Sequence, residues 1–127
     1  MKYIDRANST SRFAADVAPV LTVEPGETIV MDSHDTTRGR VRREEDVFAY
    51  AQTRDRRLVN PAAGPVFVMG AEPGDTLVVE ILDIQLDDAG SLRIMPGTMG
   101  VLTDEMESPY CRIVRIENGR AVFSPTL

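Results

Sequence analysis

Turn signals at short intervals, with β-branched runs between them, limit most strongly what this chain of 127 residues can fold into. Pro25-Gly26 and Pro73-Gly74 each stand before such a run. Proline fixes φ at the first central position of a turn and glycine accepts a positive φ at the second, so each pair predicts a type II turn. Many short strands joined by tight turns are therefore expected. The shorter runs are residues 20–23, 28–31 and 66–68.

Two later stretches carry the clearest strand signals. Residues 77–84, Leu-Val-Val-Glu-Ile-Leu-Asp-Ile, form a β-branched run long enough to predict a principal, central strand. Near the end of the sequence, Asn118-Gly119 lies between the apolar runs 111–116 and 121–123. Asn-Gly between two such runs is the strongest short-range signal for a β-hairpin, so we predict one here and a hairpin-type turn also at Pro25-Gly26.

Residues 44–52 alone have a helical pattern, with Val47, Phe48 and Ala51 on one side and acids in the first turn, where the helix dipole favours them. No linker or low-complexity stretch divides the sequence. The fold class expected is all-β (mainly β), a sandwich or barrel-like arrangement with hairpins and at most one short helix. We expect residues 1–127 to form a single β domain of this kind.

Charge and hydropathy exclude several classes of function. The formal net charge is −6, and a chain this acidic does not favour the phosphate backbone of nucleic acid. The basic residues 38–43 are followed at once by three acids, which predicts a solvated loop. No apolar run approaches the roughly 18 residues needed to cross a bilayer, and no apolar stretch follows the N-terminal charges as in a secretory signal. A cytoplasmic protein without membrane or nucleic-acid partners is the expectation.

The densest group of potential ligands is Asp32-Ser33-His34-Asp35, directly after a predicted strand. In an extended chain alternate side chains share a face, so Asp32 and His34 would point one way and Asp35 the other, unless a turn begins here. Carboxylate and imidazole groups at a strand end can hold a divalent metal or act as acid and base. The structural alternative is an Asx-type turn, in which aspartate bonds to its own backbone.

Other chemistries are poorly supported. His34 is the sole histidine, and a blue-copper site needs two histidines with a cysteine and a weak axial methionine. No Gly-x-Ser-x-Gly elbow occurs for a serine nucleophile. Cys111, the single cysteine, lies in an apolar strand pattern, where a buried and inert thiol is expected. The six methionines are scattered, which is typical of residues that fill gaps in a core.

The stretch 60–81, Asn-Pro-Ala-Ala-Gly-Pro-Val-Phe-Val-Met-Gly-Ala-Glu-Pro-Gly-Asp-Thr-Leu-Val-Val-Glu-Ile, resembles a long ordered motif of the acetamidase/formamidase family. That family motif reads Asn-Pro-x-(Thr/Ser)-Gly-Pro-(Val/Ile)-x-Val-x-Gly-Ala-x-Pro-Gly-Asp. Residues 18–30 are similar to the family's entry into its first strands, and Asp35 matches an acid a few residues further on. The resemblance covers most of residues 18–84.

The resemblance implies a β-rich amide hydrolase that cleaves a small carboxamide to a carboxylate and ammonia. It also implies a bound divalent metal, for which zinc is our first choice. Asp35 is the position carried over as metal ligand or base. His34 and Asp32 are added as candidate metal ligands on chemical grounds alone, because neither is placed in the family's pattern. The substrate-binding residues are not indicated.

Members of the family are longer than this sequence. Their second half carries a Gly-Gly-Asn-x-Asp stretch and a Gly-Asp-x-His-Ala segment, and neither occurs here. A closed metal site requires three or four protein ligands, which is more than His34 and Asp35 supply. Either a complementary C-terminal chain supplies the rest, or this is a truncated or degenerate relative. Because a half-domain should expose apolar strand surface or an open edge, we also expect assembly, as a homo-oligomer or with that chain. The alternative is a non-catalytic β module that keeps the fold for binding or assembly.

Overall fold

The computed structural model describes residues 1–99, 101–124 and 126, and it divides into two compact units. Unit 1 consists of Met1–Gly39 and Asp55–Val79, and unit 2 of Arg40–Arg54 and Glu80–Leu127. Each unit is thus built from two separate stretches of chain. The expectation of a single domain over residues 1–127 stays a prediction.

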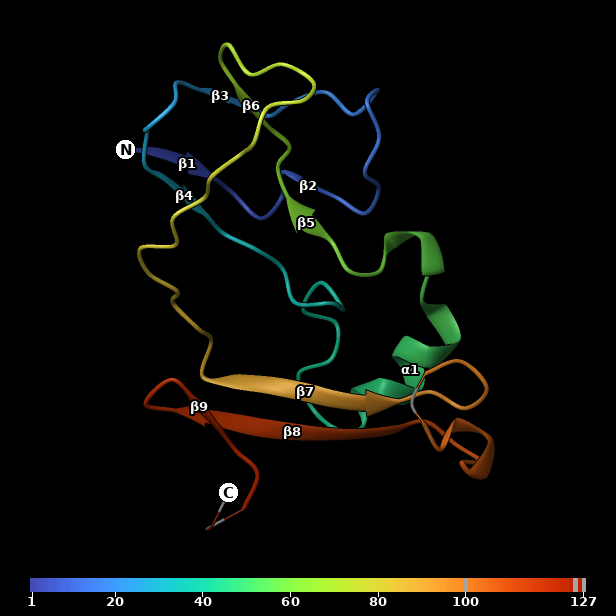
Figure 1. The fold of residues 1–127 in the computed structure, drawn as a ribbon. Coiled ribbons are helices and arrows are strands. Elements are labelled where there is room, and N and C mark those ends of the chain that lie inside the picture. Colours follow the sequence, from blue (N-terminus) through green and yellow to red (C-terminus); the bar gives the residue numbers. More distant parts are fainter. Residues whose placement is uncertain (100, 125, 127) are drawn as a thin grey trace. The chain divides into compact units, whose positions relative to one another are not determined.

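Unit 1 is made of short strands that pair two by two (Figure 1). Strand β1 lies parallel to β4, β3 lies parallel to β6, and β2 lies antiparallel to β5. Parallel partners must be joined by a crossover, so the pairing connects parts of unit 1 that lie far apart in the sequence. A 3₁₀ turn, η1, spans Arg56–Leu58. The strand bounds are β1 Lys2–Ile4, β2 Ser9–Thr10, β3 Leu21–Val23, β4 Ile29–Met31, β5 Ala62–Ala63 and β6 Val66–Val68.

Unit 2 holds a three-stranded antiparallel sheet in the order β7-β8-β9 (Figure 1). Strand β7 covers Ala89–Ile94, β8 Tyr110–Glu117 and β9 Arg120–Val122. Helix α1 (Asp46–Thr53) and the 3₁₀ turn η2 (Thr103–Glu105) complete the unit. The hairpin predicted at Asn118-Gly119 is confirmed: Glu117 pairs with Arg120, and both loop residues have positive φ, as the tight two-residue turn requires.

The largest buried cluster of the described residues belongs to unit 2. It consists of Val41, Val47, Tyr50, Met95 and Cys111. The predicted helix is confirmed, but its buried face differs from the prediction, because Tyr50 packs into the cluster while Phe48 is half exposed. Cys111 is buried in β8 as expected, and burial raises the pKa of its thiol, which disfavours the reactive thiolate.

The turn at Pro25-Gly26 forms, but the hairpin predicted around it does not. Glu27 donates its backbone N–H to the carbonyl of Glu24, at 3.2 Å, and Gly26 takes a φ of +84°, as in a type II turn. The strands on either side then diverge: β3 pairs with β6, and β4 pairs with β1. Proline and glycine determine the local turn. The strand with which each flanking strand pairs depends on residues far away in the sequence.

The prediction of a central strand over residues 77–84 is wrong for this structure. Residues 76–87 belong to no helix or strand, and every side chain from residue 71 to residue 88 is exposed. The turn before them does form, since Asp75 donates to the carbonyl of Glu72. Among the described residues no strand pairs with this run, and an extended segment without a partner has no ladder that would make it a strand.

The mainly β fold class is confirmed: the described residues form short strands with one α-helix. The sheets have two or three strands each, and none of the sheets formed by these residues closes into a barrel. Within the same residues, no helix is both long and apolar enough to span a bilayer.

Candidate functional site

The site candidates from the sequence lie in unit 1, just beyond the end of β4. The backbone N–H of Asp32 bonds to the carbonyl of Ile4, which continues the pairing of β1 with β4 by one residue. The side chain of Asp32 is held by Arg6, whose Nε and Nη2 donate to the two carboxylate oxygens at 2.7 and 2.9 Å. This hydrogen-bonded guanidinium lowers the pKa of Asp32. Asp32 is therefore ionised near neutral pH, with both oxygens engaged by an internal cation.

A turn begins at Asp35, so the simple alternation of side chains expected for an extended chain ends there. The Oδ1 atom of Asp35 accepts from both the N–H and the hydroxyl of Thr37, each at 2.5 Å, and Oδ2 accepts from the N–H of Gly39 at 3.0 Å. Arg38 and Gly39 both have positive φ within this loop. The carboxylate is thus fixed in orientation by its own loop, as in the Asx-type arrangement.

Arg38 fastens the same loop to the rest of unit 1. Its guanidinium donates to the hydroxyl of Ser9 at 3.1 Å, next to the β2–β5 pair, and more weakly to Ser11 and to the carbonyl of Leu58. The backbone of Arg38 is left-handed, with a φ of +56°. The position of Asp35 is therefore set by three separate parts of unit 1.

His34 lies between the two aspartates and is half-buried. Its proximity contributes to the lowered pKa of Asp32, so the imidazole and that carboxylate are within electrostatic reach of each other. No hydrogen bond holds the His34 imidazole among the residues the structure describes. Of the three predicted ligands, it is the one whose side chain is not already tied to a neighbour.

The residues present do not by themselves fit a resident metal ion. Over residues 1–99, 101–124 and 126, no group of three or more His, Cys, Asp or Glu side chains is placed to hold one. Asp32 is bound to Arg6, and Asp35 to its loop. A metal bound at His34 and Asp35 would need further ligands from other residues.

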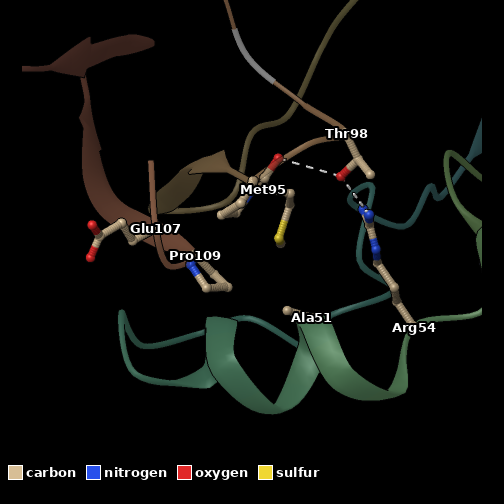
Figure 2. Close-up of a pocket in the computed structure, with 7 residues that line it drawn as sticks. Ala51, Arg54, Met95, Thr98, Glu107 and Pro109 are labelled. Carbon is tan, nitrogen blue, oxygen red and sulfur yellow. Dashed lines mark hydrogen bonds between the residues drawn. The ribbon is translucent and has the colours of Figure 1, made fainter. Parts of the chain in front are cut away.

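Unit 2 contains an open pocket of about 300 Å³ that the sequence did not predict (Figure 2). Arg54, from the end of α1, donates to the hydroxyl of Thr98 at 2.8 Å on one side of the pocket. Glu107 lies on the opposite side, with its carboxylate directed away from Arg54 in this view. Pro96 and Pro109 are typical loop residues, but no pattern in the sequence indicates that the two line one pocket. The lining residues are Ala51, Arg54, Met95, Pro96, Thr98, Glu107 and Pro109.

The profile of the Acetamidase/Formamidase family matches residues 2–124. The chain belongs to this family. Among curated members it is 34% identical over 76 residues to an acetamidase of Mycolicibacterium smegmatis and 32% identical over 74 residues to a formamidase of Methylophilus methylotrophus. Each match covers 58% of this chain and 18% of the relative.

A solved acetamidase of Bacillus halodurans has the same fold over the shared part. The TM-score is 0.85 at 30% sequence identity, and the alignment covers 98% of this chain. It covers only 41% of the Bacillus halodurans chain. More than half of the acetamidase fold therefore has no counterpart in these 127 residues.

Proposed function

We propose that this chain is part of an amide hydrolase that cleaves a small carboxamide, of the size of formamide or acetamide, to a carboxylate and ammonia. The observation that carries the proposal is the family match over residues 2–124, together with a shared fold at 30% identity. The complete active site includes the part of the acetamidase fold that has no counterpart here, because the described residues supply no closed set of ligands.

Asp35 is the residue to which we assign the chemistry on this chain. The donors that fix Asp35 are amide and hydroxyl groups of its own loop, and they set the orientation of the carboxylate before it orients a cation or acts as the base. His34, adjacent and not hydrogen-bonded within the described residues, is the second group able to accept a proton or donate a ring nitrogen. Asp32 is the weakest of the three as a ligand, because Arg6 occupies both of its oxygens.

We include a divalent metal in the proposal, with zinc as the first choice for a site of imidazole and carboxylate donors. Such an ion, when bound, polarises a carbonyl or lowers the pKa of a water. His34 and Asp35 would hold it from this chain, and the remaining ligands would come from the missing part of the fold. The metal is expected to be retained only by the complete assembly.

The test compares three variants in the completed assembly. We expect Asp35→Asn to lower the hydrolysis of formamide and acetamide by about 100-fold or more, since loss of a positioned acid–base group costs roughly 10²–10⁴. His34→Gln separates the roles: bound metal lost from both variants places both residues around the ion. Asp16→Asn, an exposed aspartate paired with Arg12, is the matched control and keeps the parent rate. Parent activity with asparagine at position 35 would remove Asp35 from the site.

A second candidate is a non-catalytic β module that keeps the fold for assembly. The long exposed apolar run at residues 77–87 favours it, because that run offers a surface for another polypeptide and no chemistry. Ammonia release measured with and without the remaining part of the fold discriminates between the two. A folded complete assembly with no activity on any small carboxamide would favour the module.

A further inference from the structure

Residues 77–87, here named the unpaired segment, form an extended apolar run that belongs to no sheet (Figure 1). Among the described residues, no backbone hydrogen bond reaches any of its eleven peptide groups. The run nevertheless has the composition of a buried strand, and its large side chains are all more than half exposed. These side chains are Leu77, Val78, Val79, Ile81, Leu82, Ile84 and Leu86.

Apolar residues occur on both faces of the unpaired segment. If it is extended, Leu77, Val79 and Ile81 share one face, whereas Val78 and Leu82 lie on the other together with Ile84 and Leu86. Strands that read as near-continuous apolar runs are buried on both faces in the interior of a sheet. The segment therefore suits a central strand with a neighbour on each edge, and a single neighbour would leave one edge open.

We propose that the unpaired segment is the docking strand for a polypeptide segment equivalent to the part of the acetamidase fold that has no counterpart in these 127 residues. That polypeptide adds one strand to each edge of the segment and covers both faces. The inference deepens the proposed function and rests on it, because it names the surface through which the complete enzyme is assembled. In the Bacillus halodurans acetamidase the additional chain amounts to more than half of the molecule, enough to supply such a cover.

A second copy of this chain is the competing occupant, and two observations disfavour it. Symmetric pairing of two copies satisfies only one edge of each segment and leaves the other open. It also brings Glu80 and Asp83 of one copy near the same acids of the other, in chains that each carry a net charge of −6. A different polypeptide can place basic or neutral residues against these acids.

The experiment measures amide hydrogen exchange in the full chain with and without a probe. The probe is the fragment of the Bacillus halodurans acetamidase that lies outside its match to this chain. We expect a 1:1 complex in which the amides of residues 77–87 exchange at least 100-fold more slowly. Ile81→Pro and Leu82→Pro remove a backbone donor from opposite edges, and each should weaken the complex at least tenfold. Val101→Lys, a nearly fully exposed position outside the segment, is the control and should leave binding unchanged.

Three results would overturn the inference: no complex, a complex in which residues 77–87 stay unprotected, or protection that develops in the chain alone as its concentration rises. Activity is scored separately. A protected complex that hydrolyses neither formamide nor acetamide upholds the docking strand and contradicts the proposed function. Hydrolysis of either amide by the chain without the probe upholds amide hydrolysis as the function and contradicts the need for a docked polypeptide to complete the site.

Discussion

Strand β8 and the first eight residues of the unpaired segment are both rich in β-branched side chains, but their structures are opposite. β8 reads Tyr-Cys-Arg-Ile-Val-Arg-Ile-Glu, and residues 77–84 read Leu-Val-Val-Glu-Ile-Leu-Asp-Ile. β8 lies between β7 and β9 and buries Cys111 and Val114, whereas the other run has no neighbour among the described residues. The difference shows that strand propensity is a local property, but strand formation needs partners on the edges.

The largest effect should come from the same substitution made in each of the two runs. Val114→Asp places a carboxylate at a side chain that is only 4% exposed and should destabilise unit 2 by about 3–5 kcal/mol, because an unpaired charge is costly to bury. Val79→Asp, in the unpaired segment, should change stability by about 0.5 kcal/mol or less, as exposed substitutions do. Thermal unfolding followed by circular dichroism measures both. Equal losses would show that the segment is already buried in solution.

A smaller effect is expected at the turns that lead into these runs. Gly119 has φ of +73°, and a Cβ added to it would meet nothing within 4 Å, so Gly119→Ala should cost about 1 kcal/mol from backbone strain alone. Gly74, before the unpaired segment, also has positive φ and open space. Gly74→Ala should cost less, because no ladder holds that turn and it can relax. Urea unfolding of both variants gives the comparison, and a larger loss at Gly74 would contradict it.

A third prediction concerns pH and a strand that is paired, β4. Arg6 lowers the pKa of Asp32 in the folded chain below its unfolded value of about 3.9. The contact therefore stabilises the fold fully above that unfolded value, and its contribution is lost as the pH falls through the lower folded pKa. The melting temperature of the parent should fall with acid in this range, and that of Arg6→Gln should fall less. Parallel pH profiles for the two proteins would exclude the contact as a source of stability.

The smallest effect should be seen with conservative changes in the unpaired segment. Ile81→Val removes one methylene from a side chain that is 71% exposed, so the melting temperature of the chain alone should not change measurably. The matching change in β8, Ile113→Val, affects a side chain packed against the core cluster and should cost about 0.5–1.5 kcal/mol. Thermal unfolding gives the melting temperatures, and urea unfolding gives the free energies of unfolding. A clear loss from Ile81→Val alone would mean that the segment packs against something in the isolated chain.

Local features of this fold could be predicted from the sequence, and non-local ones could not. The turns at Gly26 and Gly119 and the position of α1 follow from φ preferences and helical spacing, which involve neighbouring residues only. Strand β7 was not predicted, because Ala-Gly-Ser-Leu-Arg-Ile has weak β propensity and becomes a strand through its register with β8. The parallel partners β1–β4 and β3–β6 likewise depend on crossovers that no local pattern encodes.

The candidate site shows the same division. Sequence singled out Asp32, His34 and Asp35 because they are adjacent, and family likeness pointed to Asp35. It could not show that Arg6, 26 residues before Asp32, occupies the first carboxylate, or that the loop's own Thr37 and Gly39 hold Asp35. These contacts depend on the pairing of β1 with β4 and on the positive φ of the loop. The candidate residues could be identified from the sequence, but the partners that orient them could not.

The interleaved course of the chain through the two units has a consequence for how the protein can be cut. Because Arg40–Arg54 belongs to unit 2 and is flanked by the two stretches of unit 1, neither unit is a contiguous piece of sequence. A fragment beginning at residue 80 would contain the three-stranded sheet but lack Val47 and Tyr50, which α1 contributes to its core. A proteolytic cut near residue 80 would likewise separate the sheet of unit 2 from α1. A single cut in the chain therefore yields neither unit intact.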